Sequence, residues 1–185
     1  MTTDRSTALR FAWLPLPILL LAMVGFWLAK PTGAYASTPL LVALNLVFTM
    51  PAALTVAVLM GRGFRRQGAP ELLWIGGGVL LWALAGLTAA SLLEQGANLP
   101  ITIFNTSVAL AAFCHLVGVV WAMRAASSVP VARRGWWIVG AYAAVPAVVA
   151  ALTWATWTDR LPGFFIQDQG GTPVRQAVLL VAMVW

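Results

Sequence analysis

Residues 72–93 read LLWIGGGVLLWALAGLTAASLL and contain no charged side chain. A helix of about 20 apolar residues crosses the hydrocarbon core of a bilayer, so this stretch alone predicts a transmembrane helix. Small residues, which let neighbouring helices approach closely, recur along it: Gly76, Gly77, Gly78, Ala85, Gly86 and Ala89. Trp82 lies between Gly78 and Gly86 on that face. We therefore expect this helix to lie at the centre of a helical bundle.

Stretches of similar character lie on both sides of it. Four more are long enough to cross a bilayer, at 11–29, 39–61, 100–123 and 136–157, and a sixth begins at Gln176 and runs to Trp185. Hydrophobic residues make up 61% of the chain and charged residues 9%, against roughly 45–50% and 25% in soluble domains. The predicted fold class is an all-α polytopic transmembrane bundle with five full helices and a truncated sixth. We expect residues 1–185 to form one integral-membrane domain that is incomplete at its C-terminus.

The distribution of positive charge predicts the orientation of the chain in the membrane. If the helices alternate in direction, eight arginines share one side: Arg5, Arg10, Arg62, Arg65, Arg66, Arg124, Arg133 and Arg134. The other side carries only Lys30, Arg160 and Arg175. Cytoplasmic loops are enriched in Lys and Arg, so the amino terminus is expected in the cytoplasm. The net charge of +6 therefore reflects membrane topology, and we expect no nucleic-acid partner.

Two prolines, Pro51 and Pro146, fall inside predicted transmembrane helices. A proline in a helix removes one backbone hydrogen bond and frees a carbonyl one turn earlier. Both positions are therefore predicted kinks. Together with the glycine-rich face of 72–93, they could provide the moving parts of a bundle with two arrangements.

Polar residues at one depth predict a ligand pocket near the outer membrane surface. From the helix rise, Asn45 and Asn105 each lie roughly 7–9 Å below the outer interface. Thr88 lies at or above that level, and Trp154 and Trp157 lie near it. These five residues are the ligand-pocket candidates. The alternative is that they make interhelical hydrogen bonds that hold the bundle together.

His115 is the only histidine and is predicted to lie deep in its helix, beside the only cysteine, Cys114. It is a candidate cofactor-binding residue, through a His–Met haem, or a protonation switch. Alternatively, it donates a hydrogen bond to a neighbouring helix. Adjacent helical residues diverge by about 100°, so no metal site is predicted for the pair. The chain lacks catalytic signatures such as H-E-x-x-H or a Walker loop, so we predict no enzyme activity for this part and no required cofactor.

The segment from 158 to 175 is the longest predicted outer loop. Its apolar Phe164, Phe165 and Ile166 predict a structured cap at the membrane interface. Gly170 and Gly171 allow a tight turn, and Thr172-Pro173 is a helix-start pattern. Such a loop could be a simple amphipathic connector or a lid over the outer pocket.

This loop resembles the membrane-associated sensor (MASE) domains of bacterial sensor histidine kinases and diguanylate cyclases, most closely the third type. The residues that carry the resemblance are Phe164, Phe165, Ile166, Gly170, Thr172, Pro173 and Arg175. The resemblance implies a sensory input domain in the bacterial inner membrane, acting as a homodimer. It also implies a cytoplasmic output module on the same chain, a histidine kinase or a cyclase. The alternatives are a transporter or channel subunit, or a haem- or quinone-binding oxidoreductase subunit.

Overall fold

The computed structural model describes residues 15–29, 37–124, 128–166 and 170–184. Helix α2 (Pro15–Ala29) belongs to one compact unit, Met1–Tyr35, and every other element belongs to a second, Ala36–Trp185. The helices of the second unit are α3 (Thr38–Leu44), the π-helical turn η1 (Asn45–Thr49), α4 (Met50–Gln67), α5 (Glu71–Ser91), the 3-10 turn η2 (Leu93–Gln95), α6 (Asn98–Met123), the 3-10 turn η3 (Val131–Arg133), α7 (Arg134–Trp157) and α8 (Pro173–Val184). Its two short strands are β1 (Phe165–Ile166) and β2 (Gly170–Gly171).

The predicted all-helical fold is confirmed, with four helices long and apolar enough to cross a membrane among the described residues. They are Thr38–Gln67, Glu71–Ser91, Asn98–Met123 and Val131–Trp157. The predicted helix at 11–29 corresponds to α2, whose 15 described residues rise about 22 Å, less than the hydrocarbon thickness. Residues 11–14 of that prediction lie outside the described residues. The predicted helix from Gln176 corresponds to α8, which begins earlier, at Pro173.

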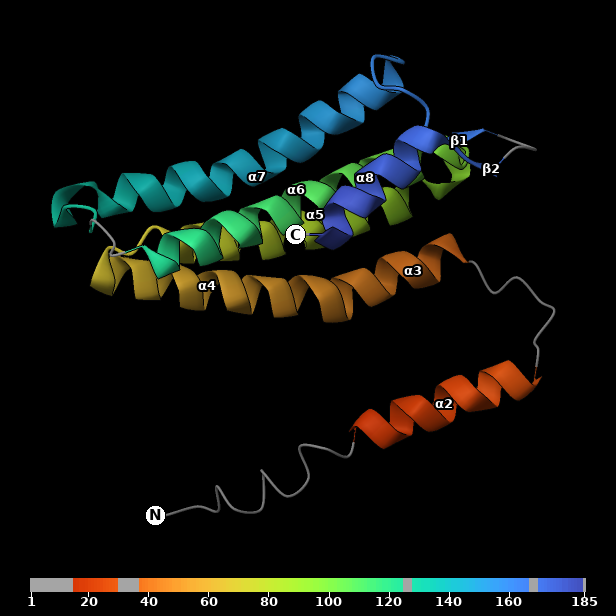
Figure 1. Ribbon diagram of the computed structural model, residues 1–185, viewed down its shortest axis with the longest axis horizontal. Helices are drawn as coiled ribbons and strands as arrows, with labels where there is room; N and C mark the ends of the chain where they lie inside the picture. The colour runs from red at the N-terminus through yellow and green to blue at the C-terminus, as the bar shows by residue number, and fades with distance from the viewer. Residues whose placement is uncertain (1–14, 30–36, 125–127, 167–169, 185) are drawn as a thin grey trace. The chain divides into compact units, whose positions relative to one another are not determined.

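Helix α5 lies at the centre of the second unit, as the sequence predicts. It packs against α3, α4, α6 and α7, and Figure 1 shows α5 and α6 between α4 and α7. In the membrane-spanning window of α5, 39% of residues are buried, against 11% for Val131–Trp157. Leu81 and Ala85 of α5 form a buried cluster with Ala111, Val145 and Val149 from α6 and α7.

The glycine-rich face of α5 allows a polar contact between α4 and α7. Tyr142 of α7 donates a hydrogen bond of 2.6 Å from its hydroxyl to the carbonyl oxygen of Ala57 in α4. A Cβ atom at Gly76 would lie only 2.8 Å from that hydroxyl. Any larger residue at Gly76 would therefore displace the tyrosine.

The end of the unit where α4 and α6 finish and α5 and α7 begin carries most of the described arginines, and we call it the arginine end. Helix α4 continues to Gln67, so the predicted helix end at residue 61 is wrong. Arg62, Arg65 and Arg66 extend the helix because arginine is a good helix former and its long side chain can reach water. The helix stops at Gly68, whose φ of 76° is left-handed and strongly favours glycine.

A single side chain, Arg134, caps the arginine end. Its guanidinium donates to the carbonyl oxygens of Arg65, Arg66 and Val129 at 2.9 to 3.0 Å and to that of Gln67 at 3.5 Å. The last carbonyls of a helix have no partner within the helix. Arg134 supplies these partners from the first turn of α7.

Helix α4 begins after the π-helical turn η1, which directly precedes Pro51. Met50 donates its backbone N–H to the carbonyl of Asn45, five residues earlier. Proline lacks the backbone N–H that would donate a hydrogen bond in a regular helix. A π-helical turn, which is wider than an α-helical turn, is one of the irregularities found in helices at such positions. The irregularity expected at Pro51 therefore takes the form of one wide turn.

The opposite end of the unit, which we call the hairpin end, contains β1 and β2. These strands pair antiparallel, with Phe165 opposite Gly171 and Ile166 opposite Gly170. Phe164 is only 4% exposed, which agrees with the predicted structured cap. Pro173 is the first residue of α8, and the backbone N–H of Arg175 donates to Thr172 Oγ1 at 3.4 Å. The helix therefore starts at the predicted Thr172-Pro173 pattern, and the Thr172 hydroxyl caps its first turn.

Candidate functional site

A pocket of about 620 Å³ opens at the hairpin end between α3, η1, α5, α6 and α8. We call it the hairpin-end pocket. Most of its walls are apolar, and four polar side chains line it: Asn45, Thr49, Asn105 and Arg175. A mostly apolar pocket with a few polar groups is the usual form of a small-molecule site.

Asn45 presents an amide oxygen at this pocket. Its Nδ2 donates to the carbonyl of Leu41 at 2.9 Å, which fixes the orientation of the amide. A Cβ atom at Gly86 would lie 3.1 Å from Asn45 Oδ1, so the oxygen rests against the glycine of the central helix. Asn45 lines the pocket because α5 has no side chain at this position.

Asn105 faces the same pocket from α6 and is only 8% exposed. Its Nδ2 is buried and has no hydrogen-bond partner among the described residues. A buried polar group without a partner costs roughly 1–3 kcal/mol. Asn105 is therefore poorly explained as an interhelical hydrogen bond, which was the alternative that the sequence left open.

Arg175 brings a positive charge to the pocket from the first turn of α8. Its Nε is buried, again without a partner in the described part of the chain. A Cβ atom at Gly171 would lie 2.8 Å from one of its terminal nitrogens, so the hairpin packs closely against the guanidinium. Helix α8 itself packs on α6, the helix that carries Asn105.

Asn98 holds the loop that positions Arg175. Asn98 Oδ1 accepts hydrogen bonds from the backbone N–H groups of Phe164 and Phe165, at 2.9 and 3.0 Å, and from the Thr102 hydroxyl at 3.2 Å. Thr172 adds a second tie, because its hydroxyl donates to the carbonyl of Gly163 at 2.8 Å. The residues of the predicted loop signature therefore form one folded unit on the start of α6.

The other three pocket candidates lie elsewhere. Thr88, Trp154 and Trp157 line a separate cavity of about 480 Å³ between α5 and α7. The Thr88 hydroxyl donates to Leu84 in its own helix at 2.9 Å, and the guanidinium of Arg160 lies 4.4 Å from the ring centroid of Trp154. The sequence predicted one cavity, and the structure has two. The prediction used only the depth of each residue in the membrane, and depth does not determine which side of its helix a residue faces.

His115 packs against α5. A Cβ atom at Gly78 would lie 3.1 Å from both Cε1 and Nε2 of its ring. The described residues contain no group of three or more His, Cys, Asp or Glu side chains that could hold a metal ion. The proposed cofactor role of His115 stays a prediction.

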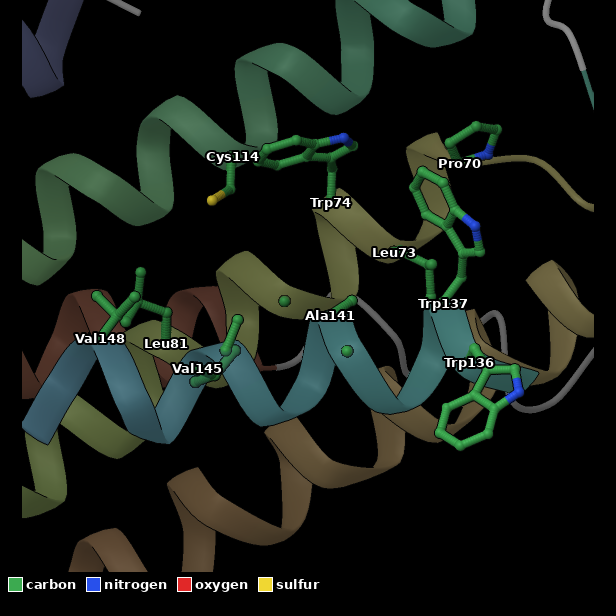
Figure 2. Close-up of a pocket in the computed structure, with 13 residues that line it drawn as sticks. Pro70, Leu73, Trp74, Leu81, Cys114, Trp136, Trp137, Ala141, Val145 and Val148 are labelled. Atoms are coloured by element: carbon green, nitrogen blue, oxygen red, sulfur yellow. The ribbon is translucent and has the colours of Figure 1, made fainter. Parts of the chain in front are cut away.

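A third cavity, of about 560 Å³, lies between α5, α6 and α7. Figure 2 shows Leu73, Trp74 and Leu81 of α5, Cys114 of α6, and Ala141, Val145 and Val148 of α7 around it, with Trp136 and Trp137 nearby. None of the described residues that line it has a charged or amide side chain, so these residues offer little to distinguish one apolar ligand from another. The hairpin-end pocket is therefore the better candidate site.

Sequence reasoning did not single out two residues that organise the ends of the unit, Asn98 and Arg134. Asn98 stands two residues before Pro100, and Asn followed by Pro at the start of an apolar run is a helix-start signal. That signal could have located the start of α6, whose first residue is Asn98 and whose N-cap residue is Ala97, but it says nothing of the partners of the Asn98 side chain. Five of their seven hydrogen bonds join residues 66 to 69 positions apart in the chain, and no local pattern indicates such a pairing.

No family model, curated protein or solved structure matches this chain.

Proposed function

We propose that the chain is a membrane-embedded sensory input domain of a bacterial signal-transduction protein, in which a ligand in the hairpin-end pocket controls a cytoplasmic histidine kinase output. One observation carries the proposal. Arg175 of α8 and the buried Asn105 of α6 line the same pocket, and each has a nitrogen without a partner among the described residues. A ligand that bonds to both would link the position of α8 to occupancy of the pocket.

The loop supports this assignment. The segment that resembles MASE domains contains the Thr172 cap and Arg175, and it is held to α6 through Asn98. Because α8 follows this loop directly, a change at Arg175 acts on the first turn of α8. A ligand shifts the equilibrium between two conformations of a protein only if it binds one of them more tightly than the other. In this proposal, the two conformations differ in the contacts of α8.

The orientation of the proposed sensor follows from the arginines. Arg62, Arg65, Arg66, Arg124, Arg133 and Arg134 lie at the arginine end, whereas only Arg160 and Arg175 of the described arginines lie toward the hairpin end. The positive-inside rule places the arginine end in the cytoplasm. Arg5, Arg10 and Lys30, which entered the sequence argument, lie outside the described residues.

In this proposal the domain sits in the bacterial inner membrane with its amino terminus in the cytoplasm. It forms a homodimer, and the pocket faces the outer leaflet. The output module receives the movement of α8 in the cytoplasm.

A pair of glycines on α5 provides a matched test. Gly86 lines the hairpin-end pocket and Gly77 lines the apolar cavity of Figure 2. Gly86→Leu partly fills the first pocket, and Gly77→Leu adds the same side chain where nothing lies within 4 Å of a new Cβ. Amide hydrogen exchange in α8 and autophosphorylation would be measured for both variants of the full-length protein in lipid nanodiscs.

We expect Gly86→Leu to change the exchange rate of α8 amides by about tenfold, which corresponds to roughly 1.4 kcal/mol, and to change autophosphorylation. Gly77→Leu should leave both near the wild-type values. Equal behaviour of the two variants would overturn the role of the pocket. A full-length protein without kinase or cyclase output would overturn the sensor assignment.

A further inference from the structure

The charge of the hairpin-end pocket is unbalanced. Arg175 contributes one positive charge, and Asn45 and Asn105 contribute neutral amides. None of the described residues that line the pocket carries a carboxylate. Glu94, the neighbour of the lining residue Leu93, is exposed and is not part of the pocket.

The unpartnered groups indicate what would balance this charge. Arg175 Nε and Asn105 Nδ2 are both hydrogen-bond donors, so the missing partner carries acceptor oxygens. A neutral carbonyl would satisfy the donors and leave the guanidinium charge in apolar surroundings, which is costly. A phosphate brings up to two negative charges and strong acceptor oxygens, whereas Arg175 is the one cation among the described residues that line the pocket. A carboxylate matches a single guanidinium in charge and in geometry.

The apolar residues that line the pocket indicate the chemistry of the rest of the ligand. Leu41, Trp82, Ile101 and Phe104 line the pocket, and they give an alkyl chain apolar contacts. The volume of about 620 Å³ lies within the range of small-molecule sites, roughly 300–1,000 Å³.

We infer that the hairpin-end pocket binds a single-chain amphiphile whose carboxylate pairs with Arg175 and whose alkyl chain lies between α3, α5 and α6. This inference rests on the proposed function only in taking the pocket as the ligand site. It adds the chemical class of the ligand, a free carboxylic acid with an apolar chain.

Two probes of equal chain length test this inference. Radiolabelled decanoate and decanol would be titrated against the full-length protein in nanodiscs of neutral phosphatidylcholine at a pH of about 8, where a carboxylic acid is ionised. Protein-free nanodiscs measure partitioning into lipid. The variants are Arg175→Gln, Arg175→Lys and, as a control, Arg160→Gln, which changes an exposed arginine that does not line the pocket.

We expect decanoate to bind the wild type about tenfold more tightly than decanol, since a charge-assisted pair replaces two unsatisfied donors. Arg175→Gln should remove this preference, whereas Arg175→Lys and Arg160→Gln should keep it. Equal affinity of the two probes for the wild type would overturn the inference, and so would an undiminished preference in Arg175→Gln. The comparison of acid and alcohol on the wild type decides the question even if Arg175→Gln does not fold.

The sensor function and the carboxylate ligand class can each be contradicted without the other. If decanol binds as well as decanoate while Gly86→Leu still alters α8, the ligand class is wrong and the sensor role stands. If decanoate binds selectively and Gly86→Leu leaves α8 unchanged, the ligand class stands and the sensor role is wrong.

Discussion

The two ends of the helical unit are closed by opposite hydrogen-bond chemistry. At the arginine end a cation, Arg134, donates to four backbone carbonyls. At the hairpin end a neutral amide oxygen, Asn98 Oδ1, accepts from two backbone N–H groups and one hydroxyl. Among the described residues, the unpartnered donors beside a polar-lined pocket lie at the hairpin end, on Asn105 and Arg175.

This difference separates a structural end from a functional one. A helix end that satisfies its own carbonyls gains stability and has little capacity left for a ligand. A pocket with unpaired donors loses stability, and proteins commonly tolerate such a loss where a ligand binds. The comparison therefore predicts that substitution of Arg134 or Asn98, which close the two ends, destabilises the fold, whereas substitution of the unpartnered pocket amide of Asn105 does not.

The largest effect is expected for Arg134→Met. The substitution keeps a long apolar side chain and removes the donors to the end of α4. We expect a loss of about 3 kcal/mol in the free energy of unfolding, since hydrogen bonds to charged groups contribute roughly 1.5–3 kcal/mol. Unfolding in mixed detergent micelles would measure it. Arg133→Met is the control, because Arg133 is exposed and makes no side-chain hydrogen bond with the described residues. Equal stability of the two variants would show that Arg134 does not hold this end.

The next effect is expected for Asn98→Leu, which deprives three donors of their acceptor. We expect about 2 kcal/mol of destabilisation, with faster hydrogen exchange at the amides of Phe164 and Phe165. Asn98→Asp keeps acceptor oxygens and should protect both amides. If exchange at these amides were unchanged in Asn98→Leu, the hairpin would be held by other contacts.

A smaller loss is expected for Tyr142→Phe, which removes the hydroxyl that bonds to Ala57 and keeps the ring. Interhelical hydrogen bonds in membranes contribute about 0.6–2 kcal/mol, so we expect about 1 kcal/mol in the same unfolding assay. Thr153→Val is the matched control, because the Thr153 hydroxyl bonds only within α7, to Val149. A Tyr142→Phe variant as stable as Thr153→Val would argue against a link between α4 and α7.

The smallest effect, and one of opposite sign, is expected for Asn105→Leu. Replacing an unpartnered buried amide with an apolar side chain of similar size removes a desolvation cost. We expect a gain of about 0.5 kcal/mol in unfolding free energy together with weaker decanoate binding. Asn45→Leu, which breaks the bond to Leu41, should give no such gain. A destabilised Asn105→Leu variant would mean that Asn105 is structural, and the contrast between the two ends would fail.

The sequence predicted the helical elements and the central position of α5 well. Apolar length determines where a membrane helix runs, and the small residues of 72–93 indicate close packing. The predicted end at residue 61 was wrong because charge was taken as the limit of the helix, whereas Gly68 ends it through its backbone conformation.

The site was predicted only in part. Depth estimates put Asn45 and Asn105 in one layer, and in the structure both residues line one pocket. The same estimates grouped them with Thr88, Trp154 and Trp157, which line another cavity. Arg175 entered through the loop resemblance and was not expected in the pocket, because its position depends on a hairpin anchored by Asn98, far away in sequence.

The wide turn at Asn45–Thr49 sets the rotational phase between α3 and α4. A π-helical turn takes up about one extra residue, and each residue of an α-helix turns the chain by about 100°. The faces that α3 and α4 present to α5 are therefore offset by roughly that angle. Deleting one residue from this turn would rotate α3 relative to α4 and carry Asn45 away from Gly86. The position of the Asn45 amide at the pocket wall thus depends on the one extra residue that this π-helical turn takes up.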